Sequence, residues 1–181
     1  MTGPHDVRLI ETATLSPTAL LSIRRLMAAA FAGDFSDDDW AHALGGWHVV
    51  AGTEETIIAH ASVVPRAIYV GGRGYRAGYL EAVAVAPLRR RTGLGTAVTV
   101  VASTLVREHF ELGVLSTSAW HFYERLGWQR WQGPAFVREP RGRLRRVEDE
   151  DDGVMALRCG PTTALDVRQP IACDQRSGDS W

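Results

Sequence analysis

The 181-residue sequence contains no lysine, and all 20 of its basic residues are arginines. Such a bias is typical of genes rich in G and C, so we do not interpret it as a sign of phosphate recognition. It does exclude the Walker A loop, which requires a Gly-Lys pair followed by Ser or Thr. The sequence therefore holds no nucleotide site of that type.

The sequence also lacks a charge imbalance and any long apolar run. Its 20 basic and 21 acidic residues leave a formal net charge of -1 at pH 7, so no overall field draws it to nucleic acid or to an anionic membrane. No run approaches the roughly 20 apolar residues of a membrane-spanning helix, and no apolar segment follows a basic start, as in a secretory signal. We therefore expect a cytoplasmic protein with no nucleic-acid or membrane partner.

Cysteine is scarce, and the two that occur, Cys159 and Cys173, lack the spacing of metal ligands. Both thiols are expected to be free. Five of the six histidines show no zinc-type spacing either, and we expect them in the core or on the surface: His42, His48, His60, His109 and His121. The sequence thus predicts no metal site.

The length favours a single domain over residues 1–181, and a globule of this size buries about 70% of the surface of its unfolded chain. Ser16 and Pro17 predict the start of a helix, as N-cap and first helical residue. Two β-like runs, 48–52 and 56–70, are separated by a short polar stretch and indicate a hairpin.

The rest of the chain alternates between strand-like and helix-like segments. Residues 75–85 predict a central strand, and apolar residues recur at helical spacing from Gly93 onward. We expect a strand over 112–118, a short helix over 119–127 that ends at Gly127, and further strands within 128–139 and 153–159. The charged stretch 140–152 is expected to be a solvated loop, and disorder is the ordinary prediction for the tail, 173–181.

A glycine-punctuated turn joins the central strand to the following helix. Such a turn offers backbone N–H groups and the positive end of the helix dipole to an anion, and pyrophosphate is the commonest ligand. The dinucleotide fingerprint G-x-G-x-x-G does not fit, because Val98 stands where its third glycine should be. The pattern that remains is Arg90-x-x-Gly93-x-Gly95.

This pattern resembles the R/Q-x-x-G-x-G/A signature of the GNAT N-acetyltransferases. The segments "FAGDFSDDDWAHALGG", "GYLEAVAV", "ELGVLSTSA", "DDGVM" and "CDQRSGDSW" resemble, in the same order, the aminoglycoside 2'-N-acetyltransferases of that superfamily. The resemblance runs from about Phe31 to the last residue. It implies an α/β fold, with a mixed, mostly antiparallel sheet flanked by helices, and a homodimer.

The resemblance also implies acetyl transfer from acetyl-CoA to the 2'-amine of kanamycin-, gentamicin- and tobramycin-type antibiotics, which gives resistance. The residues expected to hold acetyl-CoA lie on the central strand and on the turn: Val83, Ala84, Val85, Arg90, Arg91, Thr92, Gly93, Leu94 and Gly95. The N–H of Val83 is the expected oxyanion donor.

An aminoglycoside is a polycation, so its pocket must gather carboxylates that attract its ammonium groups. Each acid alone is ordinarily a solvated loop residue or a helix N-cap, and Asp39 fits an N-cap especially well. The resemblance favours substrate binding by Asp34, Asp152, Asp179 and the Trp181 α-carboxylate, and leaves Asp39 and Asp151 open. Ala82 and Ser116 are further expected substrate contacts, although a serine at a strand end is usually a helix cap.

Two side chains are expected to move protons, and one of them, Glu81, is also expected to bind the substrate amine. Glu81 interrupts an apolar strand, and burial tends to raise the pKa of a carboxylic acid, which suits a general base. It could instead be an outward-facing or arginine-paired acid. Tyr123 is the expected acid for the leaving thiolate, and its alternative is a core residue among other aromatic side chains.

Two other functions remain open at this stage. The acids would suit another polyamine-like or amino-sugar substrate of a GNAT enzyme equally well. A non-catalytic protein that binds acyl-CoA or an aminoglycoside is the alternative outside catalysis.

Overall fold

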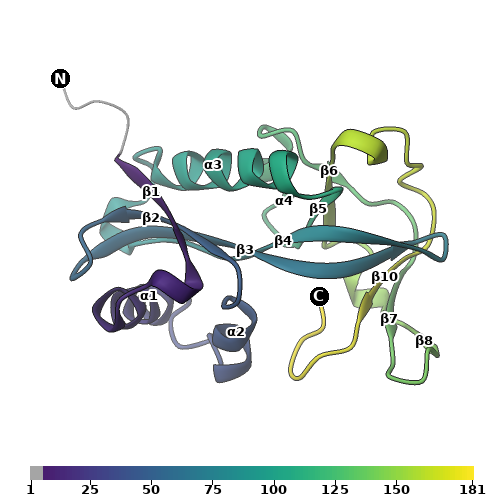
Figure 1. The fold of residues 1–181 in the computed structure, drawn as a ribbon, viewed down its shortest axis with the longest axis horizontal. Coiled ribbons are helices and arrows are strands. Elements are labelled where there is room, and N and C mark those ends of the chain that lie inside the picture. The colour runs from purple at the N-terminus through teal and green to yellow at the C-terminus, as the bar shows by residue number, and fades with distance from the viewer. Residues whose placement is uncertain (1–5) are drawn as a thin grey trace. The chain divides into compact units, whose positions relative to one another are not determined.

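The computed structural model describes residues 6–181, which form two compact units (Figure 1). The first comprises residues 6–64 together with Leu80–Thr104, and the second comprises Pro65–Tyr79 together with Leu105–Trp181. The single domain expected over residues 1–181 stays a prediction.

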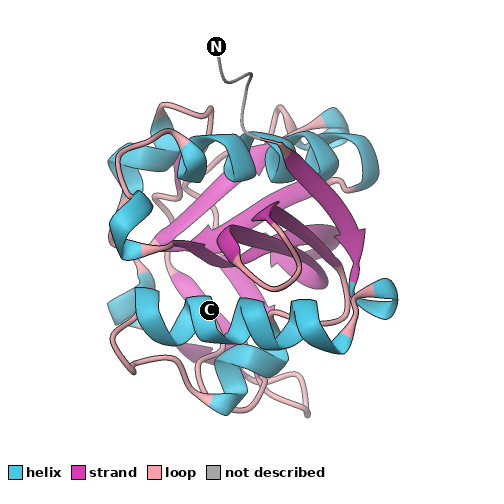
Figure 2. Ribbon diagram, turned by 90° about the vertical axis from the view of Figure 1, so that its left-hand side faces the viewer, coloured by secondary structure: helices cyan, strands magenta, loops and turns pink. Residues whose placement is uncertain are grey.

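The first unit is built on an antiparallel sheet. Strand β1 (Val7–Glu11) pairs with β2 (Trp47–Gly52), and β2 pairs with β3 (Ile57–Val70), so the expected hairpin is confirmed. The last residues of β4 (Arg73–Val85) also belong to this unit. Figure 2 looks onto the first unit and shows its strands between helices.

Helix α1 (Pro17–Ala30) covers one face of this sheet, and the start of α3 (Leu94–His109) lies on the other (Figure 1). The Ser16 hydroxyl accepts a hydrogen bond from Ala19 N at 3.1 Å, which confirms the predicted N-cap. The buried face of α1 packs against Val50, Ile57 and Ala84, and this cluster is part of the core of the unit.

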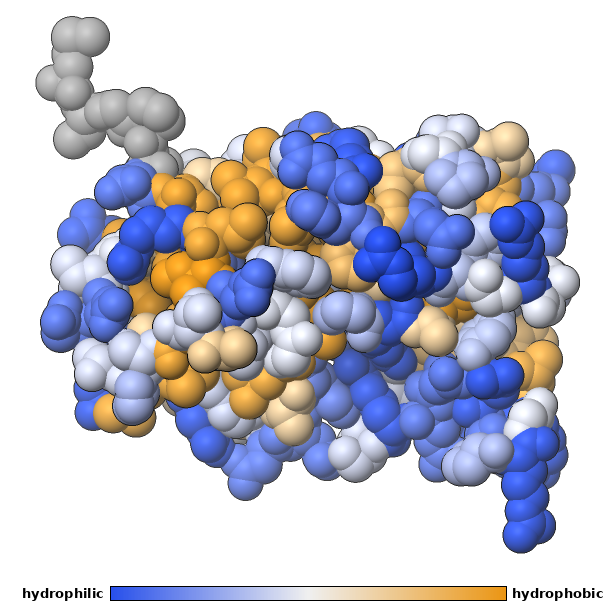
Figure 3. All heavy atoms as spheres, viewed as in Figure 1, coloured by the Kyte–Doolittle hydropathy of each residue, from blue (hydrophilic) through white to orange (hydrophobic). Residues whose placement is uncertain are grey.

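Apolar surface is also exposed on the first unit. Figure 3 shows it in orange, where β1 and the start of α3 lie. Leu9 on β1 and Val100 on α3 are each 46% exposed. Neither side chain is part of the apolar core.

The second unit contains a mixed sheet in the order β6-β9-β5-β4-β3-β10-β7-β8. Two pairings, β4 with β5 and β10 with β7, are parallel, and the others with a recorded register are antiparallel. The predicted mixed, mostly antiparallel sheet flanked by helices is therefore confirmed. The remaining elements are β5 (Leu112–Ser116), α4 (Trp120–Glu124), β6 (Gln129–Arg130), β7 (Ala135–Arg138), β8 (Leu144–Arg146), β9 (Val154–Arg158) and β10 (Ile171–Asp174).

The parallel pair of β4 and β5 is short and closely packed. It joins Ala77 to Leu112, Gly78 to Gly113 and Tyr79 to Val114. A Cβ added at Gly113 would lie 2.9 Å from Leu157 Cβ and 2.9 Å from Val106 Cγ1. Only glycine therefore allows the neighbouring side chains to approach β5 this closely.

Two predictions about the late chain were wrong. Residues 140–152 are not simply a solvated loop, since they contain β8 and a short 3-10 helix, Glu148–Glu150. The last residues are not disordered, because Ser180 and Trp181 are buried and Trp181 packs into the core of the second unit. The strand expected within 128–139 is divided into β6 and β7.

Both cysteines are buried free thiols. Across residues 6–181, no cluster of three or more His, Cys, Asp or Glu side chains could hold a metal ion. Within the same residues, the helices are too short or too polar to span a bilayer.

Candidate active site

The end of β4 carries the expected catalytic carboxylate and an irregular backbone. Glu81, Ala82 and Val83 are half-buried, whereas Ala84 is buried in the core of the first unit. Ala82 has a φ of 49°, which is a left-handed conformation of the kind found at β-bulges. For a residue with a Cβ this conformation costs about 1–2 kcal/mol, so neighbouring contacts must hold it.

Two side chains of β3 supply those contacts. Ser62 Oγ donates a hydrogen bond to the Glu81 carbonyl oxygen at 3.2 Å, and His60 Nδ1 lies 2.8 Å from the Ala82 carbonyl oxygen. His60 and Ser62 are two residues apart, so they lie on one face of the strand. The backbone on both sides of Ala82 is thus tied to β3.

The turn after β4 leads directly into α3, as the sequence predicted. It begins with a 3-10 helix, Pro87–Arg89, and Arg91 and Gly93 then adopt φ values of 63° and 88°. Gly93 O accepts from Ala97 N at 2.9 Å, in the first turn of the helix. The first N–H groups of a helix lack partners within it, so the turn can bind an anion.

Arg90 has a structural contact in the free protein. Its Nη2 donates to the Ala30 carbonyl oxygen at 2.9 Å, where α1 ends, and Thr92 Oγ1 donates to the Arg89 carbonyl oxygen at 2.6 Å. These bonds fix the shape of the turn. Of the other predicted acetyl-CoA residues on this turn, Arg91, Thr92 and Gly93 are exposed, Gly95 is half-buried and Leu94 is buried.

Two expected substrate acids lie in the first unit, after α1. Asp34 is exposed in the loop before α2 (Asp37–His42). Asp39 is not the N-cap that the sequence suggested, because Ser36 is the N-cap and Asp39 is the third helical residue. Asp39 Oδ2 accepts from Ser36 N and from Ser36 Oγ, both at 2.8 Å, and completes a capping box.

An open acidic pocket of about 390 Å³ lies in the second unit. It contains Ser116 and Asp152, which the sequence predicted, and Asp149 and Glu150, which it did not. The pocket is lined by Ser116, Thr117, Ser118, Trp120, Asp149, Glu150, Asp152 and Gly153. Three of these eight residues are carboxylic acids, so the pocket favours a cationic ligand.

Glu150 is the most perturbed acid of this pocket. Burial raises its pKa, the Ser116 hydroxyl opposes that shift, and the carboxylates of Asp179 and Asp149 raise it further. Ser116 Oγ donates to Glu150 Oε2 at 2.6 Å. Ser116 is therefore tied to a carboxylate at the end of its strand. A bound ammonium group would relieve the repulsion among these acids.

Asp152 belongs to the same pocket and is held more loosely. Its side chain is 96% exposed and accepts from Arg130 Nη2 at 2.9 Å. The Arg130 guanidinium also lies over the Trp120 ring, 4.6 Å from its centre. An exposed pair of this kind contributes little to stability, so a substrate ammonium group can compete for Asp152.

Asp151 is engaged elsewhere, although it is the neighbour of Asp152. Its carboxylate binds the Arg146 guanidinium through both oxygens, and Oδ1 accepts from Ala135 N at 3.0 Å. The hydrogen bond from Arg146 is the main reason why the pKa of Asp151 is lowered. These contacts join β7, β8 and the acidic segment, so they give Asp151 a structural role.

We therefore expect Asp151→Asn to lower the melting temperature by about 2–4 °C and to change kcat/KM by less than about twofold. The lowered pKa means that the ionised carboxylate stabilises the fold above the unfolded-state pKa, and this contribution is lost as the pH falls through the folded-state pKa. The melting temperature should thus depend less on pH below 5 in the variant. Asp152→Asn is the matched control. A loss of kcat/KM in Asp151→Asn larger than that in Asp152→Asn would contradict the structural role of Asp151.

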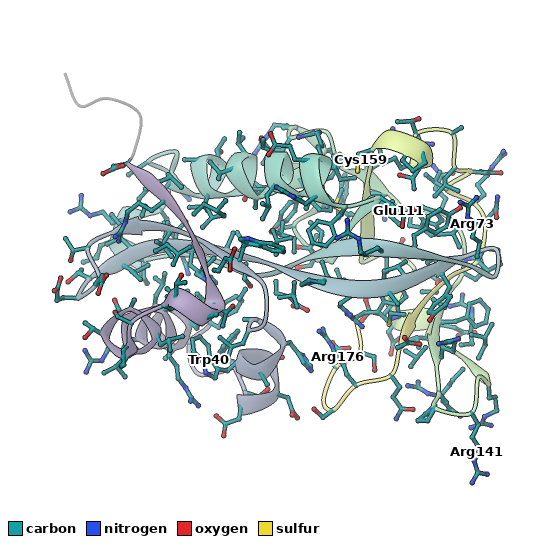
Figure 4. The ribbon with its side chains drawn as sticks, viewed as in Figure 1. Trp40, Arg73, Glu111, Arg141, Cys159 and Arg176 are labelled. Carbon is teal, nitrogen blue, oxygen red and sulfur yellow. The ribbon has the colours of Figure 1, made fainter. Side chains whose placement is uncertain are left out.

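The C-terminal segment is fixed by two arginines of the second unit. Arg66 Nη2 donates to the Ser180 carbonyl oxygen at 2.7 Å, and Arg176 Nε donates to the Asp179 carbonyl oxygen at 2.9 Å. Figure 4 shows Arg176 beside this end of the chain. The Asp179 side chain stays exposed, while the Trp181 indole is buried, 5% exposed. The indole is thus a core group, and substrate binding by the terminal carboxylate stays a prediction.

Tyr123 lies on α4 and is 8% exposed. Its ring meets those of Phe122 and Trp128 edge to face. Burial raises the pKa of Tyr123 to about 12, so the phenol is protonated at neutral pH. The surroundings suit both a core residue and a proton donor, and its catalytic role stays a prediction.

Comparison with known proteins identifies the family. Residues 11–131 match the model of the GNAT acetyltransferase domain. The chain is 42% identical to the aminoglycoside 2'-N-acetyltransferase of Mycolicibacterium fortuitum, over 98% of this chain and 92% of that protein.

Solved structures share the fold. A GNAT family N-acetyltransferase of Escherichia coli (YhbS), in complex with CoA, has a TM-score of 0.67 at 16% identity and covers 96% of this chain and 93% of its own. A GNAT family acetyltransferase of Brucella melitensis, in complex with acetyl-CoA, has a TM-score of 0.61 at 19% identity, with 93% and 96% covered. The chain therefore belongs to the GNAT acetyltransferase superfamily and, within it, to the aminoglycoside 2'-N-acetyltransferase family.

Proposed function

We propose that this protein transfers the acetyl group of acetyl-CoA to the 2'-amine of an aminoglycoside antibiotic and thereby gives resistance. The observation that carries the proposal is the 42% identity, over nearly the whole chain, to an enzyme named for this reaction. The acidic pocket beside Ser116 supports it, because an aminoglycoside carries several ammonium groups.

The residues fit acetyl-CoA, which would supply an activated acetyl thioester. The turn from Arg90 to Gly95 suits its pyrophosphate, because the chain turns at Gly93, with its positive φ, directly into α3, whose first N–H groups can bind an anion. Backbone groups of Val83, Ala84 and Val85 suit the pantetheine arm. Their side-chain identity should matter little.

Three groups of the chain are assigned to the reaction. Glu81 takes the proton that the substrate amine loses as its nitrogen bonds to the acetyl carbon, directly or through a water. The Val83 N–H donates a hydrogen bond to the acetyl oxygen as that oxygen gains negative charge. Tyr123 gives its proton to the sulfur when the carbon–sulfur bond breaks. Transfer is direct, without a covalent enzyme intermediate.

Substrate binding is assigned to carboxylates. Asp34, Asp152, Asp179 and the terminal carboxylate are the acids that the resemblance favours, and Asp149 and Glu150 join them because they line the acidic pocket. Asp39 and Asp151 are better explained by their helix-capping and arginine contacts. We further propose a cytoplasmic homodimer, and the exposed Leu9 and Val100 are candidates for its interface.

The test follows the thiol released from acetyl-CoA with two drugs. Tobramycin carries a 2'-amine, whereas kanamycin A carries a hydroxyl at that position. Thiol release with tobramycin alone, with a product acetylated at the 2'-nitrogen, is expected. Equal rates with both drugs would contradict the regiochemistry. Tight drug binding without thiol release would favour the non-catalytic alternative, and release only with other polyamines would favour a metabolic substrate.

A further inference from the structure

A chain of hydrogen bonds crosses the core of the first unit and ends at the irregular part of β4. Thr12 Oγ1 lies 2.8 Å from His48 Nε2, His48 Nδ1 lies 2.9 Å from His60 Nε2, and His60 Nδ1 lies 2.8 Å from the Ala82 carbonyl oxygen. Both imidazoles are 0% exposed. We call these four groups the histidine chain.

The acceptor at one end fixes the direction of every hydrogen bond. A carbonyl oxygen can only accept, so His60 Nδ1 must donate to Ala82, and Nε2 of the neutral ring is then an acceptor. His48 Nδ1 therefore donates to His60, and His48 Nε2 accepts from the Thr12 hydroxyl. The Gly46 carbonyl oxygen lies 3.0 Å from the same hydroxyl and is a second possible acceptor for its proton. That oxygen already accepts a hydrogen bond from Thr12 N at 2.9 Å.

The burial of the two rings keeps both of them neutral, so each ring has one donor nitrogen and one acceptor nitrogen, and the hydrogen bonds can run in only one direction. Burial lowers the pKa of His48 to about 4 and that of His60, which also feels His48, to about 3. Both rings are thus neutral at physiological pH. At its other end the Thr12 oxygen accepts from Gly45 N and Gly46 N, both at 3.1 Å, which anchors the histidine chain to the backbone.

The acceptor carbonyl is part of the peptide group that carries the proposed oxyanion donor. The carbonyl of Ala82 and the N–H of Val83 belong to one planar, trans peptide and point in opposite directions. A hydrogen bond that fixes the Ala82 oxygen therefore also fixes the direction of the Val83 N–H. Ser62 holds the preceding peptide group in the same way, through the Glu81 oxygen.

We propose that His60, oriented by His48, is a positioning residue that aims the Val83 N–H at the acetyl oxygen. This inference rests on the proposed function. Left-handed Ala82 departs from regular strand geometry, and His60 Nδ1 lies within hydrogen-bond distance of its carbonyl oxygen, so this side chain can set the direction of the peptide group. A donor aimed in advance stabilises developing charge without reorganising during the reaction.

The kinetic test compares two variants of one position. His60→Leu removes the donor and is expected to lower kcat and kcat/KM equally, about 10-fold, because the lost alignment matters only in the transition state. Its Kd for CoA should change by less than about threefold. His60→Asn keeps a donor nitrogen on Cγ, where the Nδ1 of histidine lies, and should restore most of kcat.

Ser22→Ala is the matched control. The Ser22 hydroxyl is buried in the same unit and accepts from Ile57 N of β3 at 2.8 Å, so its loss should lower the melting temperature without lowering kcat. If His60→Leu also lost only stability, or if His60→Asn were as slow as His60→Leu, the positioning role would be wrong.

Nitrogen NMR of the free wild-type protein tests the histidine chain without any substrate. Both rings should be protonated at Nδ1 only, with no titration between pH 6 and 8. Protonation of either ring at Nε2 would overturn the positioning role of His60 and leave the proposed function untouched. An inactive wild-type enzyme would overturn the proposed function, and with it the reaction that His60 serves, whatever the tautomers are.

Discussion

Glu81→Gln is expected to lower kcat for tobramycin about 10²- to 10⁴-fold, the usual contribution of a positioned general base. Glutamine matches the size of glutamate and can still hydrogen-bond the amine, but it cannot take its proton. The KM for tobramycin should change much less than kcat. Steady-state thiol release at saturating acetyl-CoA measures both constants, and a thermal melt shows whether the variant is folded.

A second acid of the same unit serves as the control for this substitution. Glu55 is exposed in the turn between β2 and β3, so Glu55→Gln removes one negative charge without touching β4. Its kcat should equal that of the wild type. If Glu81→Gln raised only KM and left kcat intact, Glu81 would be a substrate ligand and the base would be another group.

The parts of the fold and of the site that depend on local sequence could be predicted. The N-cap at Ser16 and the turn that feeds α3 follow from neighbouring residues, because capping and left-handed glycines are decided within a few positions. The capping box at Ser36 and Asp39 was also visible as a serine with an acid three residues later. Placing the cap at Asp39 overlooked this pattern.

The remaining parts depend on contacts between distant positions. The end of the chain is ordered by Arg66, more than 100 positions earlier in the sequence. Glu150 was hidden in a charged run and became notable only because Ser116 binds it. His48 and His60 show no zinc-type spacing in the sequence, and nothing in that spacing shows that they reach Ala82.

Contacts between distant positions also decide which acids are free to bind substrate. In the sequence, Asp151 and Asp152 are neighbours with similar surroundings, and only the family resemblance favours Asp152 for substrate binding. In the structure Asp151 is held by Arg146 and Ala135, whereas Asp152 stays 96% exposed in the acidic pocket. A structural partner therefore separates two residues that composition cannot distinguish, and mutation of each should produce a different deficit.

Tyr123→Phe is expected to lower kcat about 10²-fold with little change in melting temperature. The ring keeps its edge contacts with Phe122 and Trp128, so only the hydroxyl is lost. The effect should lie at the lower end of general-acid catalysis, because a phenol with a pKa of about 12 gives up its proton reluctantly to a thiolate, whose pKa is ordinarily near 8.5. Thiol release and a thermal melt measure the two quantities.

The raised pKa also predicts how the wild-type rate responds to alkali. The acid form of Tyr123 is the active one, and it persists until the pH approaches 12, so its deprotonation should not lower kcat between pH 7 and 9. Tyr75→Phe is the matched control, since Tyr75 is another buried tyrosine of the second unit, 6% exposed. Its kcat should be unchanged. If Tyr123→Phe behaved in the same way, Tyr123 would be a core residue and the departing sulfur would take its proton from another donor.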